Sequence, residues 1–164
     1  MERKSRRKQN NAGMSLIEIV VVVLIIGILS AGAVYGFSYI RSMDASSAAE
    51  EITSLLERTR LNTLSAEEAD TVLLTLSKED NHFFGEISVN SVVIDKVQIG
   101  GNGLSIKVTN SSGVTTIDSS SVAEFSYQKS NGAFSSDYTK IEVTGIKTST
   151  ITLVLGTGRC YVGN

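Results

Sequence analysis

A nearly unbroken apolar run near the N-terminus constrains this chain more than any other feature. Residues 14–29 read Met-Ser-Leu-Ile-Glu-Ile-Val-Val-Val-Val-Leu-Ile-Ile-Gly-Ile-Leu, with Glu18 as the one charged residue. Extended to about Tyr35, the run approaches the ~20 residues that cross the hydrocarbon core of a membrane as a helix. An acidic side chain costs roughly 2.5 to 3.5 kcal/mol at the middle of such a helix and less near its ends. Glu18 is therefore a candidate functional residue for which a partner must be found.

Spacing along a helix predicts that partner. If the chain is cut between Gly13 and Met14, the new α-amine of Met14 lies four residues before Glu18. Residues four apart share a helical face and are separated by about 6 Å along the axis. Cutting would thus place a cation beside the carboxylate of Glu18.

The residues before the apolar run are strongly basic. Five cationic residues, namely Arg3, Lys4, Arg6, Arg7 and Lys8, accompany one acidic residue, Glu2. This bias predicts a cytoplasmic N-terminus and a C-terminal part on the other side of the membrane. The chain has 15 basic and 17 acidic residues, so the part after residue 13 is left with a net charge near −6. That charge argues against nucleic acid as a partner, and near the C-terminus only Arg159 is available to contact a phosphate.

The order of leader, Gly13-Met14 junction, Glu18 and apolar helix closely resembles the prepilin motif of type IV pilins and type II secretion pseudopilins. The resemblance implies removal of residues 1–13 by a membrane-embedded prepilin peptidase and N-methylation of Met14. It also implies assembly with other pilin or pseudopilin subunits on an inner-membrane platform, after a stage in the lipid bilayer. The strong match covers residues 1 to about 40. The later strands and the ending Leu155-Gly-Thr-Gly-Arg159 look more weakly like the H-type minor pseudopilins.

Two other interpretations of the N-terminus remain open. The basic segment, the apolar segment and Ala31-Gly32-Ala33 also fit an ordinary secretory signal peptide, with a mature start near Val34. That interpretation gives Glu18 no role, and the apolar segment is slightly longer than the ~7 to 15 residues that are usual in a signal peptide. The second alternative is an uncleaved single-pass anchor.

A second, amphipathic helical segment follows the apolar one. No Pro or Gly occurs from Arg41 to about Leu64. Apolar residues recur at helical spacing on one face (Ala45, Ala48, Ala49, Ile52, Leu55, Leu56), whereas charged residues occupy other positions (Glu50, Glu51, Glu57, Arg58, Arg60). We therefore expect one long helix whose second half packs on a sheet.

From about Thr71 onward the apolar period changes to two, which is typical of strands. The expected strands are Val72–Leu76, Phe83–Val89, Val92–Ile99, Leu104–Val108, Val114–Ile117, Val122–Tyr127, Tyr138–Val143 and Thr150–Leu155. Turn signals at Asn110–Gly113 and Gly145–Thr148 predict hairpins, and Gly100–Gly103 and Asn131-Gly132 mark further reversals. Short strands without intervening helices predict an antiparallel meander.

Catalytic and metal sites receive little support. His82 and Cys160 are the only residues of their kinds, so no His or Cys pair has metal-ligand spacing and no intrachain disulfide can form. A His82–Cys160 dyad and a cation site at Glu67, Glu68 and Asp70 are the remaining alternatives; an exposed loop is the simpler interpretation of both His82 and the acidic residues. We expect no enzyme activity and no cofactor.

The sequence therefore predicts an α+β, pilin-like protein. Its expected parts are a cytoplasmic leader (1–13), a transmembrane and assembly helix (14–36), an amphipathic helix (37–66) and an antiparallel β domain (67–164). The expected function is that of a structural filament subunit, processed at Gly13 and Met14, methylated at Met14 and assembled through Glu18. It would lie first in the cell membrane and then in an extracytoplasmic filament. The alternative function is an anchored or secreted β domain that binds an unknown partner, including DNA in a competence-type filament.

Overall fold

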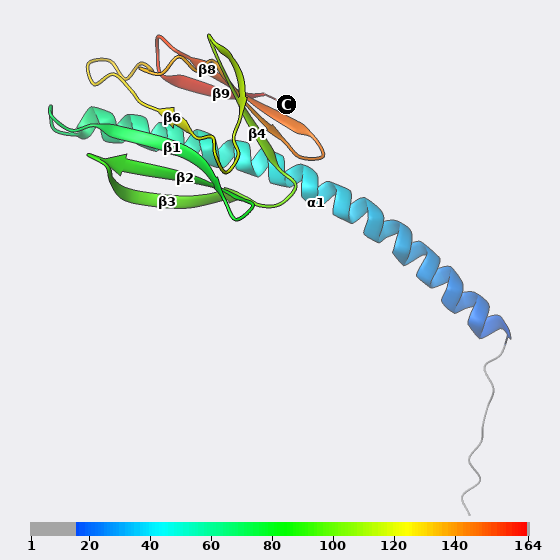
Figure 1. The fold of residues 1–164 in the computed structure, drawn as a ribbon. Helices are drawn as coiled ribbons and strands as arrows, with labels where there is room; N and C mark the ends of the chain where they lie inside the picture. The colour runs from blue at the N-terminus through cyan, green and yellow to red at the C-terminus, as the bar shows by residue number, and fades with distance from the viewer. Residues whose placement is uncertain (1–15, 164) are drawn as a thin grey trace, which may run out of the picture. The chain divides into compact units, whose positions relative to one another are not determined.

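A computed structural model describes the backbone of residues 16–163 and the side chains of residues 17–26 and 45–163. The chain divides into two compact units, residues 1–37 and residues 38–164. Helix α1 (Leu16–Ser65) begins in the first unit and ends in the second, which also contains the nine strands found in the described residues (Figure 1). A helix followed by antiparallel sheets confirms the predicted α+β class.

The strands form two antiparallel sheets. Their bounds are β1 (Val72–Glu79), β2 (His82–Val89), β3 (Val92–Gly100), β4 (Ser105–Asn110), β5 (Gly113–Thr116), β6 (Ala123–Phe125), β7 (Lys140–Thr144), β8 (Thr148–Val154) and β9 (Arg159–Gly163). Sheet A has the order β3-β2-β1-β6, and sheet B has the order β5-β4-β7-β8-β9. The prediction of a single meander is therefore wrong. The chain passes from sheet A to sheet B after β3 and returns to sheet A for β6, which pairs with β1.

The two hairpins predicted from turn residues are present. Asn110 pairs with Gly113 where β4 meets β5, and Thr144 pairs with Thr148 where β7 meets β8. The reversal at Gly100–Gly103 is not a hairpin, because it joins strands of different sheets. The reversal at Asn131-Gly132 lies between Tyr127 and Phe134, which form an isolated antiparallel bridge.

The amphipathic stripe of α1 forms the centre of the core in the second unit. All six apolar residues predicted to face the sheet are fully buried: Ala45, Ala48, Ala49, Ile52, Leu55 and Leu56. Sheet A contributes Leu74, Leu76, Phe83, Ile87 and Phe125, and sheet B contributes Ile106, Ile141, Val143 and Ile151. Thr59 and Thr63 extend the buried stripe. Their hydroxyls can be buried because they donate to the carbonyls of Leu55 and Thr59, at 2.7 and 2.9 Å.

Candidate functional site

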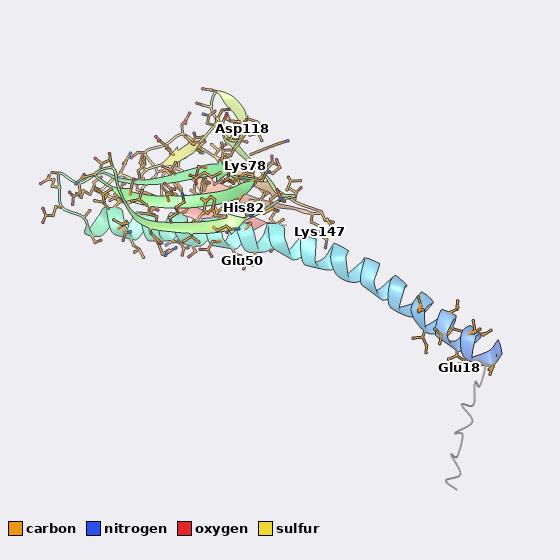
Figure 2. All side chains as sticks on the ribbon, turned by 60° about the horizontal axis from the view of Figure 1, so that its bottom comes forward. Glu18, Glu50, Lys78, His82, Asp118 and Lys147 are labelled. Atoms are coloured by element: carbon orange, nitrogen blue, oxygen red, sulfur yellow. The ribbon has the colours of Figure 1, made fainter. Side chains whose placement is uncertain are left out.

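Glu18 lies in the first turn of α1, at the N-terminal end of the described helix (Figure 2). A carboxylate in the first turn interacts favourably with the unpaired N–H groups and the positive end of the helix dipole. Gly13 and Met14, where we expect cleavage and methylation, lie outside the described residues. The pairing of Glu18 with the Met14 amine therefore remains a prediction.

The residues around Glu18 present an apolar surface on every side of the helix. Nine large apolar side chains are between 45% and 68% exposed: Ile17, Ile19, Val20, Val21, Val22, Val23, Leu24, Ile25 and Ile26. Because consecutive residues of a helix point in different directions, no single face is polar enough to be left in water. A continuous apolar surface of this kind marks a site of interaction with lipid or with other protein.

Within the residues that the structure describes, no helix contains a stretch long and apolar enough to cross a membrane. The predicted segment 14–36 includes residues 14 and 15 and the side chains of residues 16 and 27–36, all of which lie outside the description.

A cavity of about 410 Å³ lies in the second unit, between α1 and β9. Its lining combines charged, apolar and sulfur-bearing groups: Glu57, Arg60, Leu61, Gly158, Arg159, Cys160 and Tyr161. The sequence did not predict this cavity, because β9 was not among the expected strands and Arg60 was assigned to the solvated face of the helix.

Arg60 ties the helix to the loop at Gly132, which packs against the loop at Gly158 beside this cavity. Its Nε donates to the carbonyl oxygen of Gly132 at 2.9 Å. Gly132 and Gly158 have φ values of 67° and 65°, in the left-handed region that favours glycine. A side chain at Gly158 would collide with the carbonyl oxygen of Gly132, so the two loops can pack this closely only because Gly158 has no Cβ. The sequence indicates the turn at Asn131-Gly132, but nothing in it shows that this turn contacts Arg60 of the helix.

The thiol of Cys160 is poorly suited to nucleophilic chemistry. Its pKa is raised to about 11, mainly by burial and also by the nearby charge of Glu57, whereas Arg60 acts in the opposite direction. At neutral pH the thiol is therefore almost fully protonated. Because the thiolate is the reactive form, Cys160 is a weak nucleophile. Burial likewise raises the pKa of Tyr127, whose ring packs on that of Phe134 with centroids 4.5 Å apart.

The structure does not bring together the other candidate residues. His82 begins β2 in sheet A, and its Nδ1 lies 2.9 Å from the carbonyl oxygen of Asp80, whereas Cys160 lies in β9 of sheet B. The carboxylate of Asp70 accepts hydrogen bonds from Asn90 Nδ2 at 2.6 Å and from the backbone N–H of Glu67 at 3.3 Å, so it closes a turn. Among the described residues, no group of three or more His, Cys, Asp or Glu is placed to hold a metal ion.

Comparison with known proteins gives one match to a family model, over a short N-terminal segment. The family model described as the prokaryotic N-terminal methylation motif matches residues 8–34, which include Gly13, Met14 and Glu18. The chain therefore carries the prepilin-type signature. No curated protein and no solved structure is significantly similar to the chain. The weaker resemblance to H-type minor pseudopilins thus has no support beyond the sequence features that led to it.

Proposed function

We propose that this chain is a structural subunit of a type IV pilus-like or type II secretion filament. The observation that carries the proposal is the prepilin-type methylation motif over residues 8–34. The motif implies processing by a prepilin peptidase and assembly with other pilin-like subunits. Proteins of this class are structural rather than enzymatic.

The two compact units fit this role for different reasons. The described residues 17–26 of the first unit present an exposed apolar helical surface, which other subunits or lipid would cover. The second unit has its own buried core and would stay folded while the helix moves from the bilayer into a filament. A subunit that is extracted from a membrane and assembled needs both properties.

We assign Glu18 a role in assembly rather than in catalysis. In a filament of packed helices, its carboxylate would meet the Met14 amine of its own or a neighbouring subunit. Removing one member of an ion pair in a water-poor environment leaves the other charge unpaired, and this is more costly than losing the pair as a whole.

Substitution of Glu18 tests the proposal. We expect Glu18→Ala and Glu18→Gln to leave expression, insertion and leader cleavage intact, and to lower the ratio of sheared-filament to membrane-bound protein. Loss of one buried partner costs roughly 3 to 5 kcal/mol, which corresponds to at least a hundredfold change in an equilibrium ratio. Glu50→Ala is the matched control, because Glu50 is an exposed acidic residue of the same helix within the second unit (Figure 2).

The outcomes separate the possible roles of Glu18. Normal incorporation of both Glu18 variants into filaments would rule out the assembly role. A block in leader cleavage would instead place Glu18 in recognition by the peptidase. A defect of equal size in Glu50→Ala would show that the assay reports general loss of negative charge.

A further inference from the structure

Each sheet of the second unit has two edge strands, and the edges formed by β3 in sheet A and β9 in sheet B lie on opposite sides of α1 within that unit (Figure 1). In the described part of the chain, β3 pairs with β2 alone and β9 pairs with β8 alone. An open edge carries unpaired backbone groups and is a template for contact with another chain.

The first edge combines apolar and acidic groups. Val92, Val93 and Ile94 follow one another in β3 and are 65%, 51% and 54% exposed. The turn before them contacts the acidic segment after α1, because Asn90 Nδ2 donates to Asp70 Oδ1 at 2.6 Å. The β3 patch is defined here as Val92–Ile94 together with Glu67, Glu68 and Asp70.

The second edge combines apolar and basic groups around the cavity of about 410 Å³. The β9 patch consists of Leu61, Tyr161, Val162, Arg60 and Arg159, with Glu57 as the one acidic residue lining the cavity. Leu61 and Tyr161 are 63% and 56% exposed. The two arginines give this patch a positive net charge, opposite to that of the β3 patch.

The backbone of β9 is also available at this edge. The N–H of Leu153 donates to the carbonyl oxygen of Thr139 at 2.9 Å, so Leu153 points its backbone groups away from β9. Because these groups alternate along an antiparallel strand, Thr152 points toward its partner Tyr161 in β9. The backbone groups of Cys160 and Val162 therefore point to the open edge, and Cys160 lines the cavity.

We propose that the β3 patch of one copy docks on the β9 patch of the next copy in the filament. This inference rests on the proposed function and specifies which surfaces of the second unit meet. Apolar side chains of β3 enter the cavity beside β9, and the acidic segment Glu67–Asp70 approaches Arg159. A contact between two different surfaces of the second unit is heterologous, and it continues into an open filament when it does not close into a ring.

Paired cysteines test the contact in cells that produce the full chain. In a Cys160→Ser background, the variant Ile94→Cys/Tyr161→Cys is oxidised, and cross-linked species are measured separately in the membrane and sheared-filament fractions. The control is Ile94→Cys/Val114→Cys, because Val114 is 61% exposed on β5, at the other edge of sheet B. We expect a ladder of dimers, trimers and longer species for the first pair, and no more than dimers for the control and for each single cysteine.

Charge reversal tests the electrostatic part. We expect Arg159→Glu in the Ile94→Cys/Tyr161→Cys chain to reduce the ladder about fivefold, and Glu67→Lys/Glu68→Lys to restore it. A ladder no longer than the control in filaments that form normally would overturn the docking contact while leaving the proposed function intact. If no filaments form, absence of a ladder in the membrane fraction also overturns it, whereas a ladder there supports it.

Discussion

At the scale of single residues, two tight hairpins hold non-glycine residues in a left-handed conformation. Asp80 and Asn81 connect β1 to β2 with φ values of 47° and 65°, and Asn90 and Ser91 connect β2 to β3 with values of 50° and 68°. Positive φ at both central residues is typical of the type I′ turn, whose twist matches that of the flanking strands. Asn and Asp tolerate this region, but Ser does so less well.

We therefore expect Ser91→Gly to stabilise the second unit. The left-handed conformation costs an ordinary residue roughly 1 to 2 kcal/mol, and glycine avoids this cost. The greater freedom of glycine in the unfolded chain offsets about 0.5 to 1 kcal/mol of that gain. The free energy of unfolding in urea should rise by about 0.5 to 1 kcal/mol. Ser112→Gly is the control: Ser112 lies in the β4–β5 turn without a positive φ, so this substitution should be neutral or destabilising. A lower stability for Ser91→Gly would contradict the assigned turn.

At the scale of elements, the fit of α1 against sheet A depends on one glycine. A side chain at Gly85 in β2 would collide with Cδ1 of Leu55 in α1 and would lie 3.2 Å from Cδ1 of Ile99. Leu55 is fully buried, so it has little room to move away. The absence of a Cβ at Gly85 is what allows the helix to pack this closely on the sheet.

Gly85→Ala should consequently lower the free energy of unfolding by about 1 to 3 kcal/mol, the usual cost of overpacking a core. Gly156→Ala is the matched control, because nothing lies within 4 Å of the position where its Cβ would be placed. We expect that control to change stability by less than about 1 kcal/mol. Equal stability of the two variants in chemical denaturation would show that α1 packs less closely than described.

Local features of these elements could be predicted from the sequence, whereas contacts between distant segments could not. The buried stripe of α1 and the hairpins at Asn110–Gly113 and Gly145–Thr148 were predictable because they depend on local spacing and turn residues. The separation into two sheets was not, since the pairing of β6 with β1 joins distant segments. Strand β9 reads Arg-Cys-Tyr-Val-Gly, in which three apolar residues follow one another instead of alternating with polar ones. Arg60 was misassigned because its partner, Gly132, is 72 residues away.

At the scale of the whole molecule, the chain divides into two units with different properties. The first unit carries the prepilin-type signature and the exposed apolar residues, and the second carries the sheets and their core. The docking patches of the second unit would provide specificity that the apolar helix cannot provide, because an apolar surface distinguishes poorly between partners.

The second unit should therefore fold without the first. We expect residues 44–164 to be soluble and to unfold in one cooperative transition, with coincident curves from circular dichroism and fluorescence. Ile52→Ala in the same fragment should lower the free energy of unfolding by about 2 to 5 kcal/mol, since Ile52 is fully buried in the core. Absence of a cooperative transition, or no effect of Ile52→Ala, would contradict the packing of α1 on the sheets.

The central claim is that the chain is a processed, prepilin-type filament subunit, and the mass of the mature protein tests it most directly. Intact-mass and N-terminal fragment analysis of protein extracted from membranes and from sheared filaments should show Met14 as the first residue, carrying one added methyl group. The same analysis in cells that lack the prepilin peptidase should show the uncleaved leader. A mature protein that begins near Val34, or one that keeps residues 1–13 when the peptidase is present, would contradict the account.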